Sequence, residues 1–207
     1  AGGVHAEVVP CDFVDPNIDY ILWANGVKTL VRIANSFPHI DIDVIPGIYI
    51  ENRAKPQIVN GDLPFPDRAI TKKYRDNYNY IYHNKCATIK TSFGCPYKCK
   101  FCFCTQICDY CVRNIDQVLD EKNVFIVDDD FLVSRERLLK FVEGLERRGI
   151  NKHYIAFGRA DFIAANEDMI VLLHRHGFDA FFVGIESFKN SELSDYTKKT
   201  NVEINVK

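Results

Sequence analysis

The feature that most constrains this chain is a short loop that carries Cys95, Cys99 and Cys102 and directly follows the strand-like run 87–90. Three thiolates from one loop can hold three irons of a four-iron cluster and leave the fourth iron open to a donor from outside the protein. A structural zinc ion, in contrast, normally takes four protein ligands. The spacing therefore favours a metal centre with a vacant position, where chemistry can occur.

The cysteine spacing, the preceding Gly94 and the aromatic Phe101 resemble the signature of the radical S-adenosylmethionine (radical SAM) superfamily. The resemblance implies a [4Fe-4S] cluster whose open iron is chelated by the amino and carboxylate groups of S-adenosylmethionine. Reductive cleavage of that cofactor releases methionine and a 5′-deoxyadenosyl radical, which abstracts hydrogen from a small-molecule substrate. The implied partners are this substrate and an electron donor such as flavodoxin or ferredoxin. The cofactors carry the reaction and the protein positions them.

A second cysteine triplet, Cys104, Cys108 and Cys111, repeats the spacing of the first. One alternative is therefore a non-catalytic module in which the two triplets bind structural zinc. We favour the interpretation that the second triplet consists of free thiols or helix residues. Cys11 and Cys86 are expected to be buried thiols.

Length and composition are those of an ordinary globular protein. The chain has 207 residues, 47% of them hydrophobic and 26% charged, with a formal net charge of −2. It is long enough to bury a core, and its balanced charge gives no reason to expect nucleic acid as a partner. No apolar stretch is long enough for a bilayer span and no signal-peptide pattern is present, so we expect no membrane association and a cytoplasmic location. In that reducing compartment eight cysteines indicate metal binding.

The chain is expected to be an internal fragment of a longer α/β protein with three parts. It begins without Met in a Gly-Gly turn and stops without completing a helix or strand pattern. We expect residues 1–55 to be the C-terminal part of a Rossmann-like domain, 56–84 a linker, and 85–207 the N-terminal part of a partial barrel. An incomplete barrel exposes an apolar edge, so the fragment is expected to be poorly soluble or to pair with a partner.

The first part combines turns with short apolar runs. Within 27–34, Val27, Leu30, Val31 and Ala34 fall on one helical face, and 45–50 is expected to add a strand after a turn. The Gly-Gly turn with the following residues to Ala6, together with Pro10, Asp19-Tyr20 and the run 63–68, resembles the radical SAM enzymes with an N-terminal cobalamin-binding domain.

That narrower resemblance implies a corrin at the carboxyl ends of the Rossmann-like strands. It also implies methyl transfer from methylcobalamin to an unactivated carbon, or a ring rearrangement. The candidate cobalamin contacts are Gly2, Gly3, His5 and Gly26. Alternatively, the glycines only supply turns and His5 is a polar turn residue. The family often has an acidic Gly-Glu-Gly-Glu turn where this chain has 24–27, so a radical SAM enzyme without cobalamin is the alternative function.

From residue 85 the pattern alternates between strands and helices. Strands are expected at 87–90, 123–127, 153–157 and 180–183, and helices at 135–147 and 166–176. The apolar side of the first helix is expected to consist of Leu138, Leu139, Val142 and Leu145. Parallel strands with helical crossovers predict the first four units of a (β/α)6 barrel, whose ligands bind at the carboxyl ends of the strands.

Polar residues follow these strands and are the candidate contacts of S-adenosylmethionine. Carboxylates suit its ammonium and ribose diol, and an arginine suits its carboxylate. The resemblance assigns Asp128, Asp129 and Asp130 to the methionyl amine. It assigns Arg159, Glu186 and Ser187 to ribose or methionyl contacts, and the backbone near Phe101 to the adenine. Alternatively, one aspartate caps the following helix, and Arg159 and Glu186 form an ion pair that braces the barrel mouth.

Overall fold

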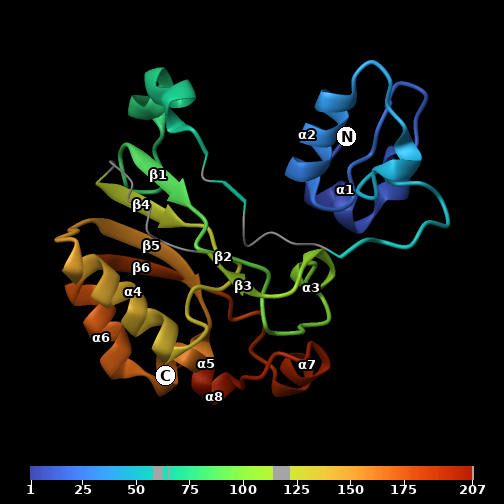
Figure 1. Ribbon diagram of the computed structural model, residues 1–207. Coiled ribbons are helices and arrows are strands. Elements are labelled where there is room, and N and C mark those ends of the chain that lie inside the picture. The colour runs from blue at the N-terminus through green and yellow to red at the C-terminus, as the bar shows by residue number, and fades with distance from the viewer. Residues whose placement is uncertain (58–62, 65, 114–121, 207) are drawn as a thin grey trace.

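The centre of the molecule is a parallel four-stranded sheet. The structure, a computed structural model, describes residues 1–57, 63–64, 66–113 and 122–206. The sheet has the order β1-β4-β5-β6, as Figure 1 shows. Its strands are β1 Cys86–Ile89, β4 Asn123–Ile126, β5 His153–Gly158 and β6 Phe178–Val183. The predicted α/β fold class and the four predicted strands are confirmed.

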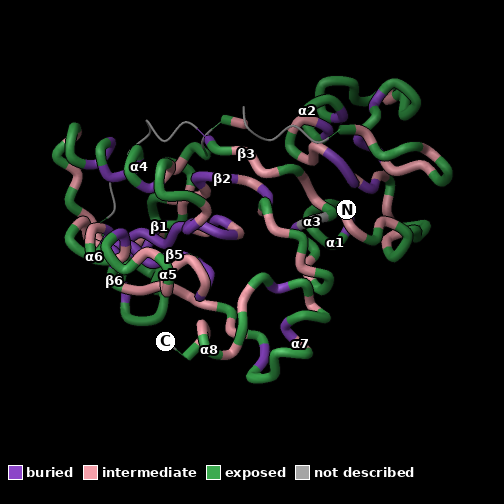
Figure 2. Tube along the Cα trace, turned by 90° about the horizontal axis from the view of Figure 1, so that it is seen from below, coloured by how far each residue is buried: buried purple, intermediate pink, exposed green. Residues whose placement is uncertain are grey.

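The two faces of the sheet bury different side chains. Val124 and Ile126 of β4 belong to the main core, which also contains Leu138 of helix α4 (Arg135–Arg147) and Leu173 of helix α6 (Glu167–Arg175). Phe125, between those two strand residues, points to the other face, since side chains alternate along a strand. Figure 2 shows the buried residues concentrated along these strands. The helices thus cover one face, and the aromatic face forms the inside of the partial barrel.

Helix α4 follows the predicted boundaries because its end signals are strong. The Ser134 hydroxyl accepts a hydrogen bond from the Arg137 backbone N–H at 3.3 Å, and Gly149 follows the helix with a φ of 61°. The sequence placed Leu139 on the buried side, which is wrong: Leu139 is 41% exposed, whereas Phe141 is buried.

Residues 1–57, called here the N-terminal part, contain helix α1 (Val4–Val8), the 3₁₀ turns η1 (Pro10–Phe13) and η2 (Ile42–Val44), and helix α2 (Gly26–Ser36). The strand expected at 45–50 is reduced to a single antiparallel bridge between Leu22 and Ile48. A proline and a glycine within that run shorten the extended segment. Within these residues, the small core is built from Ile33, Ile45 and Ile48.

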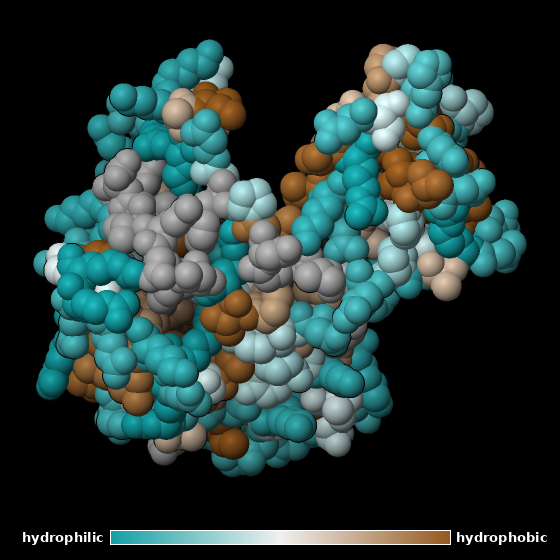
Figure 3. All heavy atoms as spheres, viewed as in Figure 1, coloured by the Kyte–Doolittle hydropathy of each residue, from teal (hydrophilic) through white to brown (hydrophobic). Residues whose placement is uncertain are grey.

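Helix α2 confirms the predicted helix but turns a different face inward. Its buried residues are Thr29 and Ile33. Val27, Leu30 and Val31, the predicted apolar face, are 53–58% exposed. Figure 3 shows hydrophobic residues on the surface of the N-terminal part. Periodicity located the helix, but it did not decide which side packs against the small core.

The remaining elements connect these parts. The predicted linker contains the 3₁₀ segment η3 (Arg68–Asn77), while residues 58–62 and 65 lie outside the described residues. Around the cysteines lie β2 (Ser92–Phe93), α3 (Cys104–Ile107) and β3 (Cys111–Val112). Short helices α5 (Ala160–Ala165), α7 (Asn190–Asp195) and α8 (Val202–Asn205) follow β5 and β6. In the described ranges, no helix is long and apolar enough to cross a membrane.

Candidate functional site

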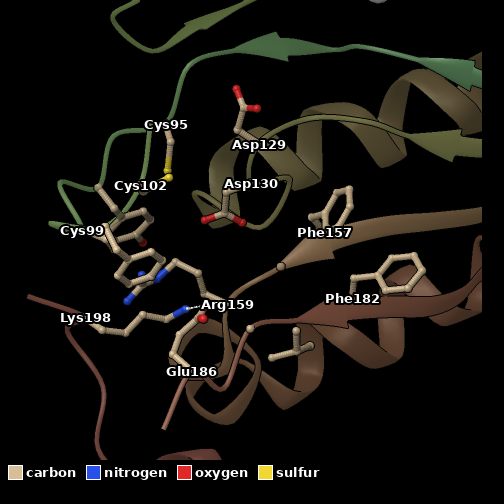
Figure 4. Close-up of a pocket in the computed structure, with 15 residues that line it drawn as sticks. Cys95, Cys99, Cys102, Asp129, Asp130, Phe157, Arg159, Phe182, Glu186 and Lys198 are labelled. Atoms are coloured by element: carbon tan, nitrogen blue, oxygen red, sulfur yellow. Dashed lines mark hydrogen bonds and ion pairs between the residues drawn. The ribbon is translucent and has the colours of Figure 1, made fainter. Parts of the chain in front are cut away.

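A cavity of about 440 Å³ lies where the cysteine loop, residues 94–102, meets the carboxyl ends of the parallel strands. Figure 4 shows side chains from both regions converging on it. We call it the ligand pocket. Its polar and sulfur-bearing lining residues are Cys95, Tyr97, Cys99, Cys102, Asp129, Asp130, Arg159, Glu186 and Lys198. With Phe101, which also lines the pocket, the structure therefore brings together the three predicted cluster cysteines and five of the predicted cofactor-binding residues.

The cysteine loop is held in place by backbone pairing and by one glycine. Strands β2 and β3 pair in antiparallel register at its two sides. Gly94 has a φ of 68°, and a Cβ atom there would lie 2.6 Å from the backbone oxygen of Cys108. Only glycine meets both conditions, because other residues are strained at positive φ and would collide with that carbonyl. This glycine turns the chain so that all three cysteines line the pocket.

The three thiols are of the chemical type that holds an iron–sulfur cluster, and all three line one pocket. Among the described residues, no three His, Cys, Asp or Glu side chains converge as the ligands of one metal ion do. A four-iron cluster binds each cysteine to a different iron, so its ligands need not meet at one point. Burial, with smaller contributions from the neighbouring Asp130, Cys102 and Cys99, raises the pKa of the Cys95 thiol to about 11, although a backbone hydrogen bond at Tyr97 opposes this. Since metals bind thiolates, loading this site must release protons.

The cysteines of the second triplet, Cys104, Cys108 and Cys111, lie outside the lining of the ligand pocket. Cys104 is buried on α3, where its thiol shares a hydrogen bond with Cys102, and burial raises its pKa. Cys111 lies in β3, and neither it nor Cys108 lines the ligand pocket. Cys86 is buried as expected, but the expectation for Cys11 is wrong, because this residue is exposed on η1.

Asp128, one of the predicted cofactor contacts, is fully buried and does not line the pocket. Its carboxylate accepts hydrogen bonds from the backbone N–H and hydroxyl groups of Thr91 and Ser92 at 2.5–2.9 Å. It also forms an ion pair with Arg137 of α4 at 2.6 Å. These partners use both oxygens, so Asp128 fixes the entry to the cysteine loop against β4 and α4.

Asp129 and Asp130 do line the pocket. Asp129 pairs with Lys90 at 3.3 Å. Asp130 accepts a hydrogen bond from the Leu132 backbone N–H with Oδ1, while its buried Oδ2 has no hydrogen-bond partner in the described part of the chain. Burial raises the pKa of Asp130 to about 6. The unpaired oxygen gives a bound ligand an acceptor for an N–H donor. The alternative that an aspartate caps the next helix is wrong, since Ser134 caps α4.

Arg159 and Glu186 both line the pocket, but they do not pair with each other. Two nitrogens of Arg159 bind the two oxygens of Asp161 at 2.8–2.9 Å, and the guanidinium lies 3.9 Å from the ring centre of Tyr97. Glu186 pairs with Lys198 at 2.7 Å. The predicted alternative of an Arg159–Glu186 brace is therefore wrong. Sequence reasoning missed Asp161 and Lys198, and no motif marked Lys198, which lies twelve residues beyond its partner.

Ser187 and Phe101 have different surroundings. The Ser187 hydroxyl donates to Glu192 at 2.6 Å and accepts from the Lys189 N–H, so it organises the start of α7 and lies outside the pocket lining. Phe101 lines the pocket, is 53% exposed and packs edge-on against Tyr196. Its predicted place near an adenine stays a prediction.

The candidate cobalamin residues lie on the N-terminal part. Gly2 and Gly3 are exposed before α1, and Gly26 begins α2. His5 on α1 forms a 2.7 Å contact with Asp12 and packs edge-on against Phe13. The structure gives these residues local roles, and their cofactor role stays a prediction.

Comparison with known proteins yields sequence and structural relatives. No family model matches the chain. It is 27% identical to the hopanoid C-3 methylase of Methylococcus capsulatus, over 97% of this chain and 42% of that protein. It is 23% identical to the anaerobic magnesium-protoporphyrin IX monomethyl ester cyclase of Synechocystis sp., over 89% of this chain and 40% of that protein. The chain thus spans about two fifths of these relatives' length.

A solved structure shares the fold along nearly the whole chain. The cobalamin-dependent S-adenosylmethionine radical enzyme OxsB, with aqua-cobalamin and S-adenosylmethionine bound, superposes with a TM-score of 0.72. The two are 20% identical, and the match covers 99% of this chain and 33% of OxsB. By sequence the chain is similar to the hopanoid C-3 methylase, and its fold is similar to that of the cobalamin-dependent S-adenosylmethionine radical enzyme OxsB.

Proposed function

We propose that the protein to which this chain belongs is a radical SAM enzyme that methylates an unactivated carbon of a small molecule with the help of cobalamin. The observation that carries the proposal is the convergence of Cys95, Cys99 and Cys102 on one pocket at the carboxyl ends of the parallel strands. When bound there, a [4Fe-4S] cluster supplies the electron that cleaves S-adenosylmethionine into methionine and the hydrogen-abstracting radical. A reduced flavodoxin or ferredoxin is the proposed source of that electron.

The chain's own residues bind and orient these groups. The three thiols hold the cluster, and the unpaired Asp130 oxygen accepts a hydrogen bond from the cofactor's amine. Asp128 keeps the entry to the cysteine loop fixed to β4 and α4. Phe157 and Phe182 on the inner sheet face line the pocket, and this apolar surface strengthens the polar contacts beside it.

The cobalamin dependence rests on the relatives. OxsB is described as cobalamin-dependent, and the hopanoid relative is a methylase. The second candidate is radical chemistry without cobalamin. The pairing of His5 with Asp12 favours it, since this imidazole has a partner without a corrin. Retention of cobalamin by the full-length protein, measured by its visible absorption, separates the two candidates.

The cluster is tested by anaerobic reconstitution of the full-length protein with iron and sulfide, followed by electron paramagnetic resonance with and without S-adenosylmethionine. We expect about four irons per chain and a signal that shifts when the cofactor is added. Cys99→Ala should lose both the iron and the shift. Cys111→Ala, outside the pocket lining, is the matched control and should keep both. Retention of zinc, with no cluster and no shift, contradicts the proposal.

A further inference from the structure

Two cationic side chains, Arg159 and Lys198, line the ligand pocket, and they differ in how many of their hydrogen-bond donors are paired. Arg159 presents two nitrogens to the two oxygens of Asp161, at 2.9 and 2.8 Å, and stacks on Tyr97. That fork is the geometry with which arginine binds a carboxylate, and here a carboxylate of the protein already occupies it. Arg159, the residue expected to bind a ligand carboxylate, is therefore already paired with Asp161.

The second cation, Lys198, has donors to spare. Its side chain is only 8% exposed, and its ammonium pairs with Glu186 Oε1 at 2.7 Å. A lysine ammonium carries three N–H donors. Within the described ranges, Glu186 is the one hydrogen-bond acceptor that Lys198 Nζ has. Leaving buried donors unpaired is costly, so a ligand that supplies an anionic acceptor at this point is favoured.

The backbone places this ammonium at the carboxyl end of β6. Thr197, two residues after α7, has a φ of 57°, and the Lys198 N–H donates to the Leu193 carbonyl at 3.0 Å, so the chain turns back toward the pocket. Gly184 makes room for the pair, because a Cβ atom there would collide with the Glu186 carboxylate and lie 3.1 Å from Lys198 Nζ. Figure 4 shows Lys198 extending into the site beside Glu186 and Arg159.

The pocket also contains a complementary acceptor. Asp130 is 3% exposed, and its Oδ2 has no partner among the described residues. A cation with spare donors and a carboxylate with a spare oxygen in one cavity suit a zwitterion, which carries a carboxylate and an ammonium on one carbon. A methionyl group is such a zwitterion.

We propose that Lys198 is a ligand-binding residue that receives the carboxylate of S-adenosylmethionine, while Glu186 holds the ammonium in position. The inference rests on the proposed function and assigns one contact within it. Arg159 then orients the cysteine loop through Tyr97 and leaves the carboxylate to Lys198.

The test is equilibrium binding to the reconstituted full-length protein of S-adenosylmethionine and of decarboxylated S-adenosylmethionine, which lacks only the carboxylate. Lys198→Met should weaken S-adenosylmethionine binding roughly tenfold to a hundredfold, the usual range for a hydrogen bond to a charged group. Binding of the decarboxylated compound should change less than about twofold, because it never made the contact. Lys198→Arg should restore most of the affinity. Lys199→Met, at the adjacent exposed position, is the matched control and should bind both compounds like the wild type.

Lys198→Met leaves the Glu186 carboxylate without its partner, which could unfold the protein. The double variant Lys198→Met with Glu186→Gln removes that unpaired charge and keeps the test valid. In this variant the affinity for S-adenosylmethionine should fall as it does in Lys198→Met, while the affinity for the decarboxylated compound should fall much less. Equal loss of both ligands in the variants, or unchanged S-adenosylmethionine binding in Lys198→Met, overturns the inference and leaves the proposed function standing. If the wild type with its cluster binds neither compound, the proposed function fails and the inference fails with it.

Discussion

At the scale of single residues, Asp128 shows how a charged group can serve a site without touching its ligand. Its fully buried carboxylate is surrounded by the donors of Thr91 and Ser92 and by the guanidinium of Arg137. A buried charge with this many partners is costly to disturb, because removing it leaves the arginine uncompensated.

Asp128→Asn should lower the free energy of unfolding by about 3 kcal/mol, since a buried ion pair is broken and a donor replaces an acceptor. Urea denaturation of the iron-free protein measures this. Asp129→Asn, which removes the half-buried partner of Lys90, is the control and should cost less than about 1 kcal/mol. Equal losses of unfolding free energy in the two variants would show that the Asp128 network stabilises the fold no more than the pair of Asp129 with Lys90 does.

At the scale of elements, the arrangement of the helices depends on a few contacts between side chains. Arg135 at the start of α4 binds both carboxylate oxygens of Asp168 in α6, at 2.8 and 2.6 Å. These hydrogen bonds lower the pKa of Asp168 to about 2. Because the folded-state pKa is below the ordinary value of about 4, the contact stabilises the fold above that value and is lost as the pH falls toward about 2.

Asp168→Asn should therefore reduce stability at neutral pH, and the difference from the wild type should shrink as the pH falls from about 4 to about 2. Urea titrations at several pH values measure the difference. Glu143→Gln, at an exposed position of α4, is the control and should show no such convergence. A difference that stays constant across this pH range would rule out the ion pair as its source.

Helix α2 offers a second test at this scale, because the hydrophobic periodicity and the structure assign different side chains to its buried face. Ile33→Ala should cost about 2–4 kcal/mol of stability, since Ile33 packs against Ile45 and Ile48. Leu30→Ala, at a site 58% exposed, should cost less than about 0.5 kcal/mol. Thermal denaturation of the chain compares the two variants, and the opposite ranking would mean that the predicted face is the packed one.

At the scale of the whole molecule, local signals in the sequence predicted the parallel sheet, its crossover helices and the cysteine loop. Each single strand, each helix and the cysteine loop carries its signal within about ten positions, and the alternation of strands and helices then predicts the parallel pairing. The roles of Asp128 and Lys198 could not be predicted in this way. Asp128 meets Thr91 across 37 positions, and Lys198 reaches Glu186 only because a left-handed residue follows α7.

The edges of the four-stranded sheet also affect how the isolated chain behaves in solution. Among the described strands, β1 and β6 have a neighbour on one side only, and Phe157 on the strand next to β6 is 38% exposed. Unpaired strand edges beside apolar surface promote association. Sedimentation of the isolated chain should therefore show concentration-dependent self-association, which the full-length protein should lack. A monodisperse monomer at all concentrations would contradict this expectation.

The network around Asp128 also couples the cysteine loop to the rest of the fold. Thr91 and Ser92 are bound by a carboxylate that follows β4 and that also pairs with Arg137 of α4. The cysteine loop that follows them is therefore shaped by contacts distant in sequence. It follows that the loop is only as rigid as the strand and the helix that anchor its first residues.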